Sequence, residues 1–507
     1  MILQTIKGHI RKLTSRLPPK ESLTEEEVRY GLETLIKDGM TSQALVTMTS
    51  GAFLVAFALK LGASNMIIGL LAAIPPLMQL VQIPAILLVE KVRNRRLICA
   101  GASFIGRTFW LLIAISAIIL GPEDVLYFMI IAMMIIASLS AVSNCSWNSW
   151  MRDLVPQDQL GAFYSRRIRL ATGVGIVLSL AAAVFIDLIK KKLPIYEIYG
   201  YATIFVLGFL AGMLGVYFIT RIPEQKMTVQ KRHIPLLHLI LKPFADLNYK
   251  RLILFLGPWN FAVNLAAPFF TVYMLKRLEL GLSVVIALTV LSQTVNIGFI
   301  RIWGRFSDRY SNKSVLSVSG PLFMACVLGW TFTTMPEKYV ATYPLLIILH
   351  VLMGISTAGV TLASGNIALK LAPKDQGTAY LAANSLVNSL AASIGPILGG
   401  KFADFFAARE LAMNLTWKSP LKEVSFNTLN FQHWDFFFAM AFLIGTYSLF
   451  RLSKVHESGE VEESIVIHEL ISEIRNPIRS FSTIGGLRKI IYFPFARLEK
   501  VFETTEQ

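Results

Sequence analysis

Charged side chains are scarce in this sequence. Asp, Glu, Lys and Arg make up 16% of its 507 residues, whereas soluble domains carry about 25%. Hydrophobic residues make up 54%, and the mean hydropathy is +0.57. This composition excludes an ordinary soluble domain and indicates a chain that is embedded in a membrane.

Cysteine is also scarce, and sequence signatures of enzymes are missing. Cys99, Cys145 and Cys326 fall within or at the ends of apolar runs, without the spacing of a disulfide framework or a metal site. The chain has no phosphate-binding glycine loop and no Ser-His-Asp context. We therefore expect neither catalysis nor a cofactor.

Long apolar runs dominate what is present. A helix needs about 20 mostly apolar residues to cross about 30 Å of hydrocarbon. The runs of that length are 39–60, 65–89, 97–120, 124–151, 168–188, 196–221, 251–275, 281–305, 314–335, 341–368, 378–403 and 433–453. The sequence thus predicts an all-α polytopic membrane protein with twelve transmembrane helices.

A short phrase occurs once in each half of the chain. Leu154–Gln159 recurs as Leu371–Gln376, 217 positions later, and Glu90–Arg95 is matched by Asp308–Lys313 at an offset of 218. Two matches at nearly one offset indicate a duplicated unit, and hence two pseudo-symmetric six-helix bundles. Inside a membrane, such repeats are typical of transporters whose site lies between the halves.

The net charge is +16, and its distribution decides what it means. If the N-terminus lies inside, most Lys and Arg fall in the inner loops and the two termini, with Lys190–Lys192 as the exception. This asymmetry predicts a multi-pass protein of the cell (plasma or inner) membrane with both termini in the cytoplasm. The basic residues then contact anionic membrane lipid, and no nucleic-acid partner is expected.

The predicted spans divide the chain into five segments. They are an N-terminal segment 1–38, a bundle 39–221, a linker 222–250, a bundle 251–454 and a tail 455–507. Thr24–Glu27 is a capping box followed by apolar residues at helical spacing, which predicts a short amphipathic helix on the cytoplasmic surface. The tail is basic and amphipathic, so it either lies on the membrane or packs on the protein's own inner face.

One loop resembles the signature of the major facilitator superfamily, G-x-x-x-D-[RK]-x-G-[RK]-[RK]. Gly304–Lys313 is a good copy that departs from it at Ser311 and Asn312. The corresponding loop of the first half is a degraded copy, with Ile86 in place of the leading Gly and Glu90 in place of Asp. The resemblance covers roughly residues 39–454.

Two further elements are similar to members of that family. Gly395–Gly400 looks like its G-P-x-x-G-G element, and the segment Trp147–Pro156 resembles a poorly characterised bacterial subgroup. The resemblance implies a cavity lined mainly by the first, fourth, seventh and tenth spans. It also implies a site near mid-membrane that opens alternately to the two sides.

Acidic and basic residues gather at the inner ends of the spans. Charge pairs between the two halves at this level would hold in one state of the transporter only. The candidates for this gating role are Glu90, Arg152, Asp153, Asp308 and Arg309. The alternative is that these charges only set the topology. We favour gating because acidic residues contribute little to topology.

Amide side chains recur four residues apart in the spans that would line the cavity, which puts each pair on one helix face. The substrate-binding candidates are Asn144, Trp147, Asn148, Trp259, Asn260, Asn264, Gln293, Asn296, His350, Asn384 and Asn388. Amides both donate and accept hydrogen bonds, so they suit a neutral or amphiphilic organic solute. The alternative is that several of them bridge helices, at about 0.6 kcal/mol each.

Charges within the spans are few. No carboxylate is expected near mid-depth in the first, fourth or seventh span, and His350 is the one ring of suitable pKa near the pathway. Arg107 lies deep in the third span and would suit an anion. We favour a structural role for it, because the third span is peripheral in the family that the chain resembles.

These features predict a monomeric secondary transporter for a small, neutral or amphiphilic organic solute. It would work by rocker-switch alternating access. The alternative is a non-transporting receptor or assembly factor on the same scaffold. The basic tail is the feature that supports this alternative.

Overall fold

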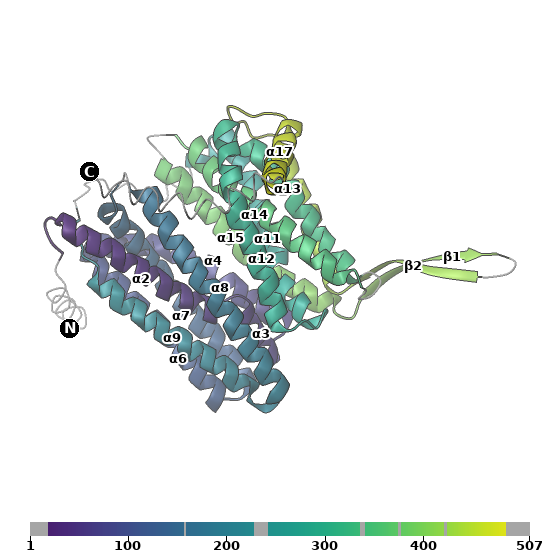
Figure 1. The fold of residues 1–507 in the computed structure, drawn as a ribbon, viewed down its shortest axis with the longest axis horizontal. Coiled ribbons are helices and arrows are strands. Elements are labelled where there is room, and N and C mark those ends of the chain that lie inside the picture. The colour runs from purple at the N-terminus through teal and green to yellow at the C-terminus, as the bar shows by residue number, and fades with distance from the viewer. Residues whose placement is uncertain are drawn as a thin grey trace.

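The computed structural model describes residues 19–156, 159–227, 242–334, 340–373, 377–419 and 423–482. Within these residues, twelve helical segments are long and apolar enough to cross a membrane. Figure 1 shows them as two bundles, the N-terminal one in purple and blue and the C-terminal one in teal and green. The predicted polytopic fold with twelve spans is confirmed.

The first two spans of the N-terminal half are interrupted. Its elements are α2 (Glu25–Thr49), α3 (Ala52–Lys60), α4 (Asn65–Met78), η1 (Gln79–Val81), α5 (Gln82–Val92), α6 (Arg95–Ile119), α7 (Pro122–Leu154), α8 (Leu160–Lys192), η2 (Pro194–Tyr196) and α9 (Glu197–Arg221). The first span breaks at Gly51, whose φ of +59° glycine adopts readily. The second changes to a 3₁₀ turn just before Pro84, whose ring clashes with a helical carbonyl four residues earlier.

The C-terminal half repeats the pattern of six spans. Its elements are η3 (Lys242–Phe244), α11 (Leu247–Lys276), α12 (Leu282–Arg309), α13 (Asn312–Gly329), η4 (Trp330–Thr334), α14 (Thr342–Leu371), α15 (Gly377–Phe406), β1 (Glu410–Lys418), β2 (Glu423–Gln432), α16 (Trp434–Leu452) and α17 (Glu463–Ser482). We call the side that holds the start of α2 and the end of α16 the near side, and the opposite side the far side.

A β-hairpin projects from the far side (Figure 1), which the sequence analysis did not predict. β1 and β2 pair antiparallel, from Glu410 opposite Gln432 to Lys418 opposite Glu423. In β1, Leu411, Met413, Leu415 and Trp417 alternate with other residues at the period of a strand. The segment escapes a search for apolar runs of membrane length because its apolar residues are not consecutive.

The first helix differs from the expected arrangement at its near end. The predicted capping box is present, since Thr24 N donates to Glu27 Oε2 at 3.1 Å and Glu27 N donates to Thr24 Oγ1 at 3.3 Å. However, α2 continues to Thr49 without interruption. The predicted short helix and the start of the first span are therefore one helix, and Asp38 lies inside it.

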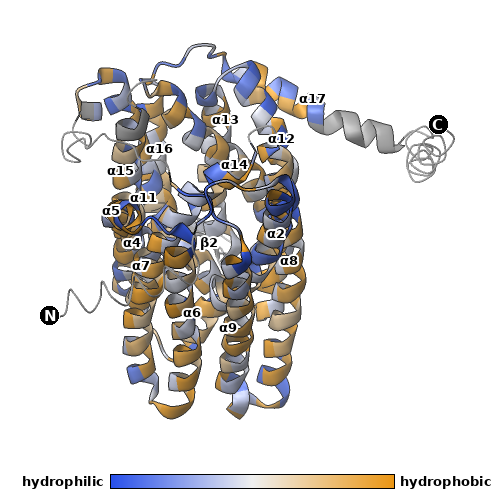
Figure 2. Ribbon diagram, turned by 90° about the vertical axis from the view of Figure 1, so that its left-hand side faces the viewer, coloured by the Kyte–Doolittle hydropathy of each residue, from blue (hydrophilic) through white to orange (hydrophobic). Residues whose placement is uncertain are grey.

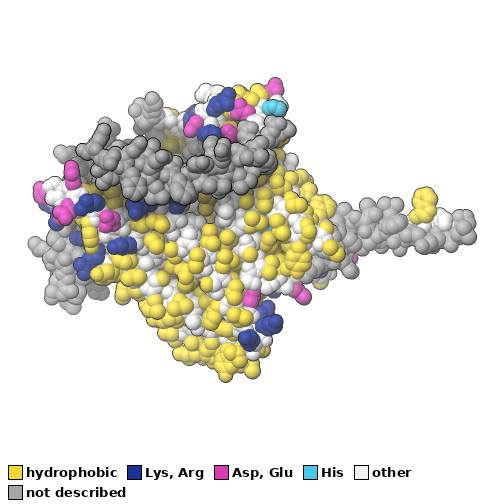
Figure 3. Space-filling model, viewed as in Figure 1, with side chains coloured by type: hydrophobic (Ala, Val, Ile, Leu, Met, Phe, Trp, Pro, Cys, Tyr) yellow, Lys and Arg dark blue, Asp and Glu magenta, His cyan; other side chains and the backbone are white. Residues whose placement is uncertain are grey.

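Apolar side chains both fill the bundles and cover them. Trp150, Trp303 and Trp330 are among the largest fully buried side chains, whereas Ile119 and Val177 are 72% and 67% exposed. Figure 2 shows apolar residues along the helices and hydrophilic ones at their ends, and Figure 3 shows an apolar surface over the bundles. An apolar surface of this extent suits contact with lipid.

Candidate transport pathway

The two halves pack most closely through α4 and α15. A Cβ at Gly69 would overlap the carbonyl oxygen of Pro396, and a Cβ at Gly400 would overlap the carbonyl oxygen of Asn65. Small residues let membrane helices approach until their backbones touch. The glycines thus permit the contact between the halves, and α4 is the far-side part of its span.

Two aspartates join the halves at the far side. Asp404, near the end of α15, accepts from Asn65 N at 3.1 Å and from Met66 N at 2.9 Å. Asp187, near the end of α8, accepts from Leu282 N at 3.0 Å and Ser283 N at 2.8 Å. Each carboxylate therefore caps the N-terminus of a helix in the opposite half, where unpaired amides and the helix dipole favour a negative charge.

The near-side parts of the broken spans have different neighbours. The far-side helix α3 packs against α11 and α12 of the C-terminal half, and α4 packs against α15. Their near-side continuations pack mainly within their own half, α2 against α8 and α9, and α5 against α7. This conformation is therefore closed at the far side, and the halves separate towards the near side.

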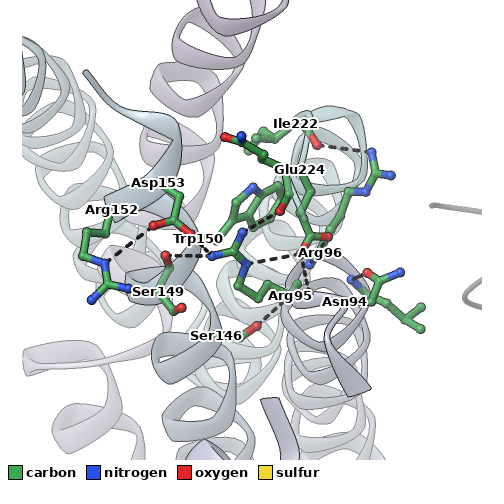
Figure 4. Close-up of polar contacts among 12 residues, drawn as sticks. Asn94, Arg95, Arg96, Ser146, Ser149, Trp150, Arg152, Asp153, Ile222 and Glu224 are labelled. Carbon is green, nitrogen blue, oxygen red and sulfur yellow. Dashed lines mark hydrogen bonds and ion pairs between the residues drawn. The ribbon is translucent and has the colours of Figure 1, made fainter. Parts of the chain in front are cut away.

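Arg95 organises the near-side charges of the N-terminal half, as Figure 4 shows. Its fully buried guanidinium pairs with Asp153 and, at 3.3 Å, with Glu224 Oε1. Arg95 also donates to Ser149 O at 3.0 Å, and Arg152 Nε lies 3.6 Å from Asp153 Oδ1. Two gating candidates, Arg152 and Asp153, thus pair inside one half in this conformation.

The other gating candidates also lack partners across the halves. Arg309 Nη1 lies 2.9 Å from Glu469 Oε1 on α17, and Glu90 and Asp308 are exposed. Over the described ranges of the chain, no ion pair joins any of the five candidates to the opposite half. Their gating role stays a prediction, which concerns the state that this conformation does not represent.

In each half, one glutamate binds the first residues of the third span. Glu224 accepts from Arg95 N at 2.7 Å and from Arg96 N at 3.1 Å. Glu457 accepts from Lys313 N at 2.7 Å and from Asn312 Nδ2 at 2.9 Å. Both glutamates follow the sixth span of their half, so the signature loops anchor the chain that leaves each bundle.

Four of the predicted amides form one ladder between α11 and α15. Asn260 Nδ2 donates to Asn388 Oδ1 at 3.1 Å, and Asn388 Nδ2 donates to Asn384 Oδ1 at 3.2 Å. Asn264 Nδ2 donates to the carbonyl of Asn260 at 2.8 Å. In this conformation the bond between Asn260 and Asn388 joins α11 to α15, which is the helix-bridging alternative for that pair.

Three of the remaining candidates lie on α7 and two on α12. Asn144 and Asn148 are exposed on α7, while Trp147 is half-buried beside them. Gln293 is exposed on α12 and lines a cavity of about 310 Å³ between the halves, together with Gln43 and Thr47. Asn296 Nδ2 donates to the carbonyl of Gly354 at 3.4 Å.

Trp259 and His350 are buried in the C-terminal bundle. Trp259 is 3% exposed and packs against Phe323, with ring centroids 5.9 Å apart. His350 Nδ1 lies 2.8 Å from the carbonyl oxygen of Leu346, and its ring contacts Trp330. The fold therefore does not gather the predicted substrate residues into a single site.

A cavity of about 500 Å³ lies within the N-terminal half, walled by α2, α4, η1, α6, α7, α8 and α9. Asn144 and Trp147 line it, together with three charged residues, Asp38, Arg107 and Arg167. Asp38 is 3% exposed and lies inside α2, so the helix of the first span carries a buried carboxylate that the predicted span 39–60 left out. The sequence signal was the capping box at Thr24, after which nothing stops the helix before Asp38.

Comparison with known proteins agrees with this architecture. The family model of the Major Facilitator Superfamily matches residues 39–396. The "Uncharacterized MFS-type transporter YxiO" of Bacillus subtilis (strain 168) is 20% identical over 269 residues, which are 50% of this chain and 60% of that protein.

Solved structures share the fold at low sequence identity. A point mutant of the nucleoside transporter NupG matches with a TM-score of 0.63 and 14% identity, over 85% of this chain and all of that chain. A POT family transporter in complex with a thioalcohol-conjugated peptide matches with a TM-score of 0.57 and 12% identity, over 85% and 96% of the two chains. With the family model, twelve spans and two matching halves, the chain belongs to the major facilitator superfamily.

Proposed function

We propose that the protein is a secondary transporter that moves a small amphiphilic organic solute by alternating access. The near side is the cytoplasmic side, as the distribution of Lys and Arg favours. The conformation described above is then the inward-facing one. The reciprocal capping by Asp187 and Asp404 is the observation that carries this proposal, because such contacts hold one state and must break when the halves rock.

Accessibility of single cysteines tests the proposal. Cys99, Cys145 and Cys326 are first replaced by serine, and one cysteine is introduced at Gln293, which is exposed and lines the cavity between the halves. Ile131→Cys, on the outer face of α7 with 58% exposure, is the lipid-facing control. An impermeant maleimide is added from each side of oriented vesicles, with and without candidate solutes.

A transporter exposes its pathway to each side in turn. We expect labelling of Gln293→Cys from the near side, with a fraction from the far side that changes when a transported solute is present. Ile131→Cys should stay unlabelled from either side. Labelling from one side only, whichever solute is added, would mean a locked protein and would refute transport.

The alternative function, a receptor or assembly factor, rests on α17. Arg305 Nη1 lies 3.0 Å from Glu473 Oε1, and Arg309 pairs with Glu469, so the tail contacts the signature loop. A partner that binds the tail would act on that loop. Removing residues 463–507 should leave solute exchange intact in a transporter, and abolish partner binding in a receptor.

A further inference from the structure

We propose that the cavity in the N-terminal half binds one anionic group of the transported solute, at Arg107 with Arg167, and that the solute is a small organic monoanion. This inference rests on the proposed transport function and narrows its substrate class. It replaces the structural role that the sequence favoured for Arg107 with one in which the same side chain both joins helices and faces the ligand.

The direct hydrogen-bond partners of Arg107 are neutral, and Ser42 lies between Arg107 and the nearest carboxylate, Asp38. It lies at the middle of α6, where Nη1 donates to Gly212 O at 2.5 Å and Nη2 donates to Ser42 Oγ at 3.0 Å. A Cβ at Gly215 would overlap Nη1, so α9 leaves room for the guanidinium. Among the described residues, no carboxylate lies within ion-pair distance of Arg107.

The charges that line the cavity do not balance. Asp38 accepts from Ser42 Oγ at 3.1 Å and lies 3.5 Å from Arg167 Nη2. Arg167 also lies over the ring of Trp147, 5.0 Å from its centroid. With Arg107 there are thus two cations and one anion in the wall. A single excess positive charge at membrane depth is costly unless a counter-ion joins it, and a monoanion would neutralise it.

The shape and lining of the cavity suit an anion with an apolar body. Its volume of about 500 Å³ is within the range of small-molecule sites. Trp110, Trp147 and Met133 supply apolar surface, whereas Ser140 and Asn144 supply hydrogen-bonding groups. A planar carboxylate matches the fork of a guanidinium and can accept two hydrogen bonds from it.

Matched acids and amides separate the effect of charge from that of shape. Binding of phenylacetate and phenylacetamide, nicotinate and nicotinamide, and lactate and lactamide is measured by thermal shift and equilibrium dialysis on the purified full-length protein. At least one acid should bind, and its amide should bind about 10- to 100-fold more weakly, the range of one charge-assisted hydrogen bond. Equal binding of acid and amide in every pair, or no bound acid, overturns the proposal.

Variants locate the anion. Arg107→Gln should weaken acid binding about 10- to 100-fold. If Arg107→Gln does not fold, Asn144→Asp is the second test, because it places a carboxylate on the cavity wall and should repel the acid. Arg169→Gln is the matched control, since Arg169 carries the same charge on α8 but is exposed and does not line the cavity. Unchanged affinity in both Arg107→Gln and Asn144→Asp overturns the site.

Two further arms distinguish the possible failures. A lipid phosphodiester carries the same single charge, so displacement of the bound acid by phosphatidylglycerol would assign the cavity to lipid and overturn a solute site. Counterflow in proteoliposomes tests transport separately. An acid that binds through Arg107 but is not exchanged would refute transport and leave the anion site standing. An exchanged amide would refute the anion assignment and leave transport standing.

Discussion

Asp187 and Asp404 are 217 positions apart, the offset of the internal repeat, and each caps the first turn of a helix in the opposite half. Their targets obey the same offset, since the amides capped are those of Asn65 and Met66 in one case and of Leu282 and Ser283 in the other. The two contacts are therefore one interaction, used twice, and together they close the far side.

Neutralising both aspartates should open the far side. Each carboxylate accepts from two backbone amides, and asparagine, with one acceptor oxygen and no charge, keeps only part of that contact. A loss of about 1 kcal/mol in Asp187→Asn or Asp404→Asn alone should shift the equilibrium about 5-fold, and the double variant about 30-fold. The measurement is far-side labelling of Gln293→Cys in vesicles. Asp124→Asn is the control, because Asp124 lies exposed in the first turn of α7 within one half. Equal labelling of the double variant and wild type would contradict the prediction.

Gly69→Ala should act in the same direction through packing. The added Cβ overlaps a backbone oxygen on α15, so α4 and α15 must separate to accommodate it, and labelling of Gln293→Cys from the far side should rise. Gly101→Ala is the matched control, since Gly101 also lies inside a helix but its added Cβ meets nothing within 4 Å. If Gly69→Ala lowers the unfolding temperature without changing the labelling, the contact between α4 and α15 stabilises the fold but does not favour the far-side-closed conformation.

Apolar runs predicted the spans well, because each crossing of the membrane needs about 20 mostly apolar consecutive residues, which are visible in the sequence. They misplaced the start of the first span, since Asp38 interrupts the apolar run without interrupting the helix. The contacts of the far-side aspartates were not predicted, although the spacing of 217 between Asp187 and Asp404 is visible in the sequence. Comparing polar residues at the repeat offset would have paired them.

The amides show the opposite limit of sequence reasoning. Spacing correctly put Asn384 and Asn388 on one face of a helix, and they hydrogen-bond each other. Which helix faces that pair depends on how α11 packs against α15, and only the fold reveals that Asn260 is the partner. Trp259 shows the same limit, because nothing local distinguishes a cavity-lining tryptophan from one in the bundle core.

Glu224→Ala should strongly destabilise the N-terminal half. Glu224 and Arg95 both have fully buried side chains, and removing one partner of a buried pair costs about 3–5 kcal/mol. Thermal unfolding in detergent measures the change. Glu21→Ala is the control, because its side chain is 83% exposed beside Lys226 and its loss should not alter the unfolding temperature. Similar unfolding temperatures for both variants would mean that Asp153 alone compensates Arg95.

Acid should destabilise the folded protein through His433, which lies at the far-side contact between the halves. Burial, together with the nearby charge of Lys276, lowers the pKa of His433 to about 4. Nε2 of His433 lies 3.5 Å from Asn65 Nδ2 of the other half, where the neutral ring accepts a hydrogen bond. Because the unfolded side chain has a pKa of about 6.5, the unfolded chain binds a proton between pH 6.5 and 4 while the folded protein does not. The contribution of His433 to the free energy of unfolding is therefore fully present above pH 6.5 and is lost as the pH falls towards 4.

His433→Gln isolates that contribution. Gln keeps an acceptor for Asn65 but does not titrate, so the unfolding temperature of the wild type should fall more steeply than that of the variant between pH 6.5 and 4. All other ionisable groups are the same in the two proteins, and the difference between the two curves removes their effect to first order. Parallel curves over this range would show that His433 is already protonated, or already exposed, in the folded protein. A steeper fall in the variant would reverse the sign of the pKa shift and place His433 beside a net negative charge.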